Sequence, residues 1–398
     1  MQLRYSYRLY PTPGQAQALS RAFGCARVVF NDALALRRAA HQAAQPYITD
    51  AQMSARLTEA KNTPGRAWLN EVSSVVLQQA QADLNTAYWN FFASVTGKRK
   101  GPKVAPPRFR SRKDSRQAIR FTRNSRFRVL GNGKLRLPKI GDVAVRWSRE
   151  LPSAPSSVTV IRDAAGRFFA SFVVETGPVP LPETNSECGI DLGLGHFAVL
   201  DDGTKIAAPR FLRRAEKKLR RLQKDLSRKV KGSRNREVAR VEVARAYAKV
   251  ANARRDFNHQ LSTKLIRENQ AVYVEDLAVK GLARTRLAKS VHDAGWSAFV
   301  KMLEYKAELH GREFRRIGRF EPTSQVCSAC GVKDGPKPLH VREWQCTACG
   351  SVHDRDVNAA RNIAALGRRE ARNARGGDVR PAPALAVAGE AGSLRGAA

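Results

Sequence analysis

Four cysteines late in the chain restrict its fold more than any other feature does. They form two Cys-x-x-Cys pairs separated by about fifteen residues, and a glycine follows each pair. This spacing is typical of a structural zinc ion held by four thiolates at the corners of a tetrahedron, and glycine permits the tight turn after each pair. The predicted zinc ligands are Cys327, Cys330, Cys346 and Cys349, and the glycines are Gly331 and Gly350.

Two disulfide bonds are the alternative interpretation of these cysteines, but a reducing cytosol disfavours them. We expect the chain to act there, in a prokaryotic cytosol and at the nucleoid. His340 and His353 are further candidate zinc ligands, although four well-spaced cysteines leave no vacancy in the shell. A closed shell of this kind is structural, so we expect it to stabilise the fold. We interpret His340 and Trp344 as packing residues.

The excess of positive charge indicates the class of partner. The 398 residues include 71 Lys and Arg against 35 Asp and Glu, which gives a formal net charge of +36. Such a chain attracts a long polyanion, and nucleic acid is the first expectation. An anionic membrane surface is the alternative, but there is no long apolar run or lipidation signal, and the strand-like start is unlike a signal peptide. We therefore expect nucleic acid, and no membrane, as the partner.

The first 180 residues predict a small β-barrel interrupted by helices. Residues 1–10 alternate polar and apolar side chains like a strand, whereas apolar residues recur at helical spacing over residues 15–92. After a basic, Pro/Gly-rich loop the period falls to two, and short strands separated by turns continue to residue 174. Strands at this spacing suggest a barrel that includes the first strand, with the helical block inserted into it.

A second unit begins with an apolar strand near Glu187. Its most basic segment, residues 210–255, predicts two helices joined by a turn at residues 231–233. One alternative is a solvated charged face, but the excess of one sign favours anion binding. Further along, the sequence predicts a strand over 271–276, a helix over 295–308 and a last helix from Asp356. The candidate nucleic-acid-binding residues on the first basic helix are Arg213, Arg214, Lys217, Arg220 and Arg221.

Three acids stand where a strand ends or a helix begins. Asp191 lies in the first strand of a predicted hairpin, Glu275 ends an apolar strand, and Asp356 lies in the first turn of the last helix, where the dipole favours its ionised form. We expect Gly193 and Gly195 to let another backbone approach Asp191 closely. Hard oxygen ligands from several elements suit Mg²⁺ or Mn²⁺, and two such ions about 4 Å apart would support phosphodiester hydrolysis.

Neighbouring acids leave alternatives open. Asp276 or Asp354 is a possible functional residue in place of its neighbour, and Asp354 is also a candidate helix cap. Asp201 and Asp202 are assigned to a turn.

The motifs occur in the same order in a known family. They are Gly189-Ile190-Asp191-Leu192-Gly193-Leu194, Val274-Glu275-Asp276-Leu277, the cysteine pairs, and His353-Asp354-Arg355-Asp356-Val357-Asn358-Ala359-Ala360. In these motifs the chain resembles TnpB, the transposon-encoded RNA-guided DNA endonuclease related to type V CRISPR effectors. The resemblance covers nearly the whole chain.

The resemblance implies an α/β plus all-β fold, with a RuvC nuclease domain of RNase H-like fold and an N-terminal wedge barrel that contains a helical recognition insertion. It implies that Asp191, Glu275 and Asp356 are the catalytic, magnesium-binding residues. The implied domains are the first barrel strand (1–12), the recognition lobe (13–100), the wedge barrel (101–180), the RuvC domain with the basic hairpin (184–322), the zinc ribbon (323–350), the final RuvC helix (351–370) and a disordered tail (371–398).

The resemblance also implies how such a protein acts. A guide RNA from the transposon end pairs with a double-stranded DNA target next to a short motif, and the chain works as a monomer with its RNA. By position, Gln78 and Thr122 face that motif. Two other functions remain open: a nuclease-inactive, RNA-guided repressor, and a transposase accessory DNA-binding protein. The presence of all three acids favours catalysis.

Overall fold

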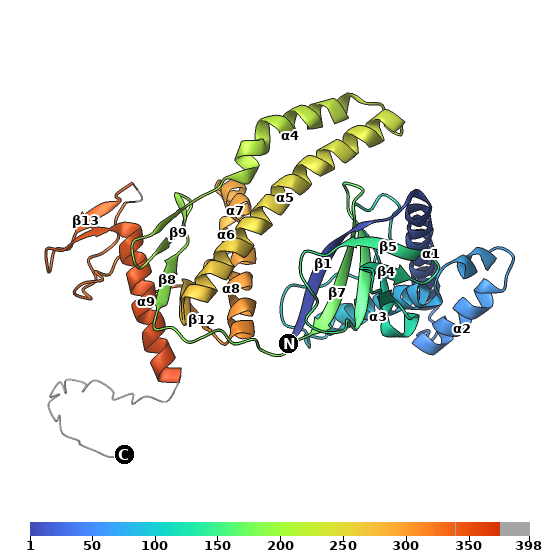
Figure 1. Ribbon diagram of the computed structural model, residues 1–398, viewed down its shortest axis with the longest axis horizontal. Helices are drawn as coiled ribbons and strands as arrows, with labels where there is room; N and C mark the ends of the chain where they lie inside the picture. Colours follow the sequence, from blue (N-terminus) through green and yellow to red (C-terminus); the bar gives the residue numbers. More distant parts are fainter. Residues whose placement is uncertain (339, 375–398) are drawn as a thin grey trace, which may run out of the picture. The chain divides into compact units, whose positions relative to one another are not determined.

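The computed structural model describes residues 1–338 and 340–374 (Figure 1). These residues form two compact units. The first comprises Met1–Pro178 and Ala215–Ala251, and the second comprises Val179–Arg214 and the residues from Asn252 onward. Each unit has its own sheet and its own buried apolar cluster.

The first unit is built on an antiparallel sheet with the strand order β2-β6-β7-β1-β5-β4-β3. The first strand of the chain lies inside the sheet, between β7 and β5. Because β2 and β3 stand at opposite ends of this order, the sheet is an open half-barrel and not the closed barrel that the sequence suggested. The strands are β1 (Gln2–Tyr10), β2 (Gln117–Thr122), β3 (Arg128–Val129), β4 (Lys134–Leu137), β5 (Gly141–Arg146), β6 (Ser157–Arg162) and β7 (Phe168–Glu175).

Helices cover this sheet and share its core. Thr12 starts the first helix: its hydroxyl accepts from the Gln15 backbone N–H, and the Gln15 side chain accepts from the Thr12 N–H in return. The first and third helices pack on each other and on β2, so sheet and helices bury one continuous cluster. The elements are α1 (Pro13–Gln42), α2 (Asp50–Lys61), η1 (Ala67–Glu71), α3 (Ser74–Val95) and η2 (Arg123–Ser125).

A helical hairpin occupies the basic segment. It consists of α4 (Phe211–Arg228) and α5 (Arg234–Glu268), so its second helix runs well past residue 255. Arg236 closes the turn, because its Nη1 donates to the carbonyls of Leu226 and Lys229, 2.8 Å from each. These carbonyls are among those that a helix end leaves without a partner.

The second unit contains a mixed sheet with the order β10-β9-β8-β11-β12. β8 and β9 are antiparallel, as are β9 and β10, whereas β11 runs parallel to both β8 and β12. The strands are β8 (Glu187–Asp191), β9 (His196–Leu200), β10 (Lys205–Ala207), β11 (Ala271–Glu275) and β12 (Glu313–Ile317).

Helices cover both faces of this sheet. On one face, Ile190, Val272 and Val274 pack with Phe299 and other residues of α8 (Trp296–His310). On the other face lies α9 (Arg355–Ala374) (Figure 1). The short elements of this unit are α6 (Val279–Leu282), α7 (Ala288–Ala294), β13 (Glu343–Gln345) and β14 (Val352–Asp354); the sequence analysis did not predict them or β10.

Two glycines bring α9 unusually close to the sheet. A Cβ on Gly189 of β8 would lie 2.7 Å from the backbone nitrogen of Ala364, and it would also clash with the Ala360 carbonyl. A Cβ on Gly367 would run into the Tyr273 ring of β11. Of the two glycines expected to permit a close backbone approach, Gly193 does so, because a Cβ there would lie 3.2 Å from the His196 carbonyl oxygen, whereas a Cβ on Gly195 meets nothing within 4 Å. The tighter approach at Gly189 was not expected from the sequence.

The last helix extends beyond its expected end. Residues 371–374, which the sequence analysis placed in the tail, form the last turn of α9, and Ala371 is buried there. The rest of the predicted tail, residues 375–398, lies outside the described residues. Within the described part of the chain, no helix is both long and apolar enough to cross a membrane.

Candidate functional site

Asp191 and Glu275 end two neighbouring parallel strands. β11 pairs with β8 in parallel, so the last residues of both strands stand side by side at one edge of the sheet. Gly189 and Tyr273, two residues earlier, face α9. Side chains two positions apart on a strand share a face. Both carboxylates therefore lie on the side of the sheet that α9 covers.

The third acid comes from the first turn of α9. Asp354, just before the helix, accepts hydrogen bonds from the backbone N–H groups of Asp356 and Val357, each 3.0 Å long. It also accepts from Lys205 Nζ at 2.6 Å. Burial opposes ionisation of Asp354, but these hydrogen bonds outweigh it and lower the pKa of that carboxyl. Asp354 is thus the helix cap, and Asp356 is left to face the other two acids.

The three acids line one cavity of about 420 Å³. Its wall is completed by the loop of residues 319–325 and by Arg342, Arg355 and Ala359. Asp276, which the sequence left as an alternative to Glu275, instead pairs with Arg319. The structure therefore brings together all three predicted catalytic residues from two strand ends and a helix start.

The charge of this cavity favours a cation. Burial raises the pKa of Asp191 to about 7, the charges of Asp356 and Glu275 add to this shift, and Arg355 opposes it. Burial and then the neighbouring Asp276 raise the pKa of Glu275. A divalent cation between such carboxylates relieves their repulsion and holds them ionised.

The carboxylate oxygens of the three acids lie farther apart than the ligand atoms around a single metal ion. Among the described residues, only the four cysteines bring three or more His, Cys, Asp or Glu ligand atoms within 4.8 Å of one another. Two ions about 3.5–4 Å apart need ligands spread over a longer span, and Mg²⁺ keeps several waters in its shell. The three carboxylates offer hard oxygen ligands of the kind that divalent cations such as Mg²⁺ prefer.

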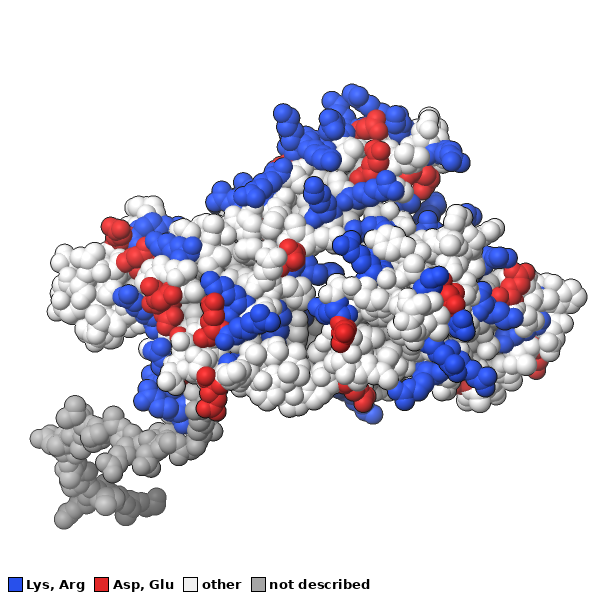
Figure 2. All heavy atoms as spheres, in the orientation of Figure 1, with Lys and Arg blue, Asp and Glu red and all other residues white. Residues whose placement is uncertain are grey.

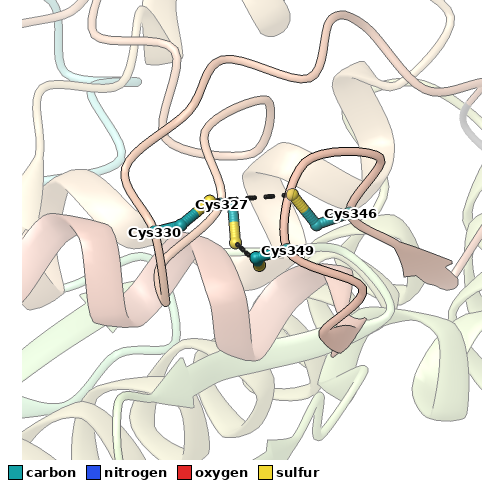
Figure 3. A group of neighbouring side chains, drawn as sticks. All are labelled: Cys327, Cys330, Cys346 and Cys349. Carbon is teal, nitrogen blue, oxygen red and sulfur yellow. Dashed lines mark hydrogen bonds between the residues drawn. The ribbon is translucent and has the colours of Figure 1, made fainter.

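The cysteines form a compact cluster in the same unit (Figure 3). Cys327 Sγ lies 3.7 Å from Cys349 Sγ, and Cys330 Sγ lies 3.7 Å from Cys346 Sγ. A tetrahedron with Zn–S bonds of about 2.3 Å has edges of about 3.8 Å, whereas a disulfide needs about 2.05 Å. The spacing fits zinc and excludes the two disulfides. Gly331 and Gly350 have φ of 77° and 72°, as the predicted tight turns require.

His353 contacts one cysteine of this cluster. Its Nε2 lies 3.0 Å from Cys327 Sγ, and its ring is 4.9 Å from that of Trp344 on the paired strand. His353 therefore neighbours one cysteine of the cluster and lies outside the group of four sulfurs that could hold a metal ion. The packing role expected of Trp344 holds, because it is buried, but His340 is exposed.

Two asparagines, whose role was not predicted from the sequence, connect the two sites. Asn358 and Asn362, one turn apart on α9, both donate to the carbonyls of Thr323 and Val326. Asn358 also accepts from the Ser328 N–H at 2.8 Å. Their spacing of four on the helix was the available signal. They fix the segment that leads into the cysteines against the helix that supplies Asp356.

Known families match three parts of the chain. A model described as "Probable transposase" matches residues 171–286, one described as "Cas12f1-like, TNB domain" matches 296–363, and one described as "Helix-turn-helix domain" matches 1–45. Here the last of these segments forms a strand and one continuous helix, β1 and α1.

Relatives match over almost the whole length. A Streptomyces pristinaespiralis protein named "Putative RNA-guided DNA endonuclease" is 46% identical over 381 residues, which cover 95% of this chain and 92% of the relative. "Putative RNA-guided DNA endonuclease InsQ" of Escherichia coli K12 is 32% identical over 380 residues, which cover 91% and 92%. The chain belongs to the TnpB family.

The fold of this TnpB-family chain also resembles a solved structure. In a cryo-EM structure of a Cas12f1–sgRNA–target DNA complex, the matched chain has a TM-score of 0.53 and 13% identity, with 88% of this chain and 82% of the other covered. At this identity the similarity concerns the fold alone.

The predicted nucleic-acid-binding residues of the TnpB-family chain lie along one helix, α4. All five are exposed, and Lys and Arg side chains gather over the hairpin in Figure 2. Arg213 donates to Ser290 Oγ and Arg220 pairs with Glu216. The five are Arg213, Arg214, Lys217, Arg220 and Arg221.

Gln78 and Thr122 both belong to the first unit. Gln78 is exposed on α3, and Thr122 is the half-buried last residue of β2. Since α3 packs on β2, the two residues occupy neighbouring elements. Their contact with a DNA motif stays a prediction.

Proposed function

We propose that this TnpB-family chain is a transposon-encoded, RNA-guided DNA endonuclease that hydrolyses phosphodiester bonds with two Mg²⁺ or Mn²⁺ ions. The observation that carries the proposal is the convergence of Asp191, Glu275 and Asp356 on one cavity. Membership of the family and the names of the relatives support it. All three acids are present, so no observation favours the nuclease-inactive alternative.

The strand order of the second unit supports a RuvC domain of RNase H-like fold. An antiparallel run of three strands, β10-β9-β8, continues into the parallel pair β11-β12. Parallel pairing of β8 with β11 is what sets two acids at one edge, and α9 crossing the same face adds the third. The predicted domain boundaries are part of the proposal, which assigns the basic hairpin to the RuvC domain although Ala215–Ala251 group with the first compact unit.

Five charged residues of the cavity have a proposed task. Bound ions would activate a water and stabilise the leaving oxygen. Asp191, Glu275 and Asp356 would hold the ions in a fixed geometry, because each carboxylate is anchored at the end of a regular element. Arg342, whose Nη1 is 3.4 Å from Asp356 Oδ1, and Arg355 would bind phosphate oxygens beside them.

The remaining parts would bind RNA and DNA. The cationic hairpin of α4 and α5 would contact phosphates, the half-barrel would act as the wedge, and helices α1 to α3 would form the recognition lobe. The partners are a guide RNA from the transposon end and a double-stranded DNA target, held by a single copy of the chain. The cysteine cluster would hold a structural zinc ion, as its 3.7 Å sulfur spacing supports.

The test compares cutting with binding. The complex is purified with its copurified RNA, which is sequenced so that a matching DNA target is supplied with Mg²⁺. Asp191→Ala and Glu275→Ala should each lower the cleavage rate at least about a thousandfold, because bound ions supply several kcal/mol of transition-state stabilisation. Guided DNA binding should persist. Asp202→Asn, an exposed acid in the β9–β10 turn, is the control and should cut normally. Loss of binding in both alanine variants would show that these acids are structural.

A further inference from the structure

A phenylalanine at the rim of the acid cavity is almost fully exposed. Phe320 belongs to the loop that lines the cavity with Asp191, Glu275 and Asp356, and it is 93% exposed. Among the large apolar side chains that are exposed in the described chain, it has the highest exposure. Because the phenyl ring is exposed to water, it does not contribute the stabilisation that burial of such a ring would give. The ring is therefore available to a ligand beside the acids.

The backbone that carries this ring is fixed on both sides. Before it, Arg319 donates to the backbone carbonyl and the carboxylate of Asp276. After it, the side-chain amides of Asn358 and Asn362 donate to the Thr323 carbonyl, at 3.3 and 2.7 Å. Since both anchors lie within four residues of the ring, the loop presents it at a defined place. Preorganisation of this kind lowers the entropy lost on binding.

The charges around the ring select the ligand class. Arg319 and Arg342 line the same cavity, and the Arg342 side chain is 62% exposed. A flat aromatic ring with guanidinium groups beside a two-ion site matches a nucleotide, whose base stacks while its phosphate meets the cations. Bases within a duplex are covered on both faces by their neighbours. The match is therefore to an unpaired strand.

We propose that Phe320 is a stacking platform for an unpaired DNA base next to the phosphate that enters the acid cavity. This inference rests on the proposed nuclease function. Pairing of a guide RNA with one target strand displaces the other, which supplies unpaired DNA. By holding one base, the ring sets which phosphodiester bond reaches Asp191, Glu275 and Asp356. Phe320 is thus a positioning residue for the substrate and takes no part in bond cleavage.

The first measurement detects base stacking on Phe320 by fluorescence, in a variant that does not cleave DNA. The full chain with Asp191→Ala is assembled with its guide RNA on DNA targets that carry 2-aminopurine at single positions of the displaced strand. Stacking quenches this fluorophore, so one position should be dim. Adding Phe320→Ala should restore its fluorescence at that position only. If no position responds to Phe320→Ala, the inference is overturned.

The second measurement separates stacking from apolar contact. Phe320→Ala should lower single-turnover cleavage at limiting target about tenfold, within the range that alanine substitution at a stacked base gives. Phe320→Trp should keep the wild-type rate, and Phe320→Leu should match the alanine variant. Val352→Ala removes another apolar side chain, 70% exposed on β14 and outside the cavity, and should change nothing.

Each outcome separates the inference from the function it rests on. A wild-type rate in Phe320→Leu would mean that the ring serves as an apolar contact, which contradicts stacking. Normal cutting by Phe320→Ala would overturn the inference and leave the nuclease proposal intact. A wild-type chain that never cuts a matched target would defeat the nuclease proposal, while the fluorescence experiment would still report whether a base stacks on the ring.

Discussion

The cysteine cluster and the acid cavity lie in one unit but are assembled in opposite ways. The cysteines come from one short segment, and their sulfurs lie within 4.8 Å of one another in a closed shell. The acids come from β8, β11 and α9, which are far apart in the chain, and they surround an open cavity. A closed thiolate shell suits a structural ion, whereas open carboxylates leave room for water and substrate. One site is therefore a local sequence motif, and the other is a product of the fold's topology.

The largest expected effect comes from removing one sulfur of the closed cysteine cluster. Cys346→Ser should reduce zinc from about one per chain to near zero and lower solubility, because structural zinc contributes roughly 10–16 kcal/mol of apparent binding free energy in small zinc domains. Metal analysis by mass spectrometry measures this. Cys25→Ala, outside the cluster, should retain its zinc. Full zinc occupancy in Cys346→Ser would contradict the ligand assignment.

A second change attacks the packing that builds the acid cavity. Gly189→Ala should destabilise the second unit by about 1–3 kcal/mol, because the new methyl group meets the α9 backbone. The cleavage rate should fall as well, since α9 carries Asp356, but zinc content should not change. Gly195→Ala is the matched control, because a Cβ there has open space. Equal stability of the two variants in urea unfolding would show that α9 can move away without harm.

A third change tests whether the two sites are independent. Asn358→Ala leaves the half-buried Ser328 N–H without its protein partner, while Asn362 still holds the Thr323 and Val326 carbonyls. A fully buried unpaired group costs about 1–3 kcal/mol, and a half-buried one costs less because water reaches it. We expect faster zinc loss to a chelator and a lower cleavage rate in the same variant. Asn362→Ala should have a smaller effect, because Asn358 keeps both carbonyls.

The smallest expected effect concerns the surface outside both sites. Changing Arg214, Lys217 and Arg221 to Gln should weaken nucleic-acid binding and flatten its dependence on salt by about 0.7–0.9 in the logarithmic slope per lost phosphate contact. Arg136→Gln, which removes an arginine paired with Asp142, is the control. Titrations of binding at several salt concentrations give the slope. An unchanged slope would mean that α4 presents only a solvated charged face.

Much of the fold was visible in the sequence because local patterns dominate it. Alternation predicted the strands of the first unit, and the basic helices were predicted from their spacing. The open half-barrel was not predicted, because the sequence does not show whether the two edge strands of the sheet pair with each other. The short helices α6 and α7 carry too few residues for a helical period to stand out.

In the candidate site, too, some features were predicted from local sequence and others depend on tertiary contacts. The acids were chosen by their places at strand ends and a helix start. The residues alone left Asp354 open as an alternative, the resemblance favoured Asp356, and the hydrogen bonds to Asp354 agree because they make it the helix cap. The close packing of Gly189 on α9 was not predicted, because a sequence does not show which distant backbone segments approach each other. His353, Asn358 and Asn362 act through contacts between elements, so their roles appeared only in the structure.

The cysteine cluster, the positive charge that favours nucleic acid as a partner, and the family motifs could be identified from the sequence alone. These depend on spacing and composition within short stretches, where the chain has little freedom to place residues elsewhere. Only the tertiary structure decided that Asp191, Glu275 and Asp356 share a cavity and that Phe320 stands exposed at its rim. The physical reason is that parallel pairing of β8 with β11, and the close packing of α9 on them, join residues that no local pattern connects.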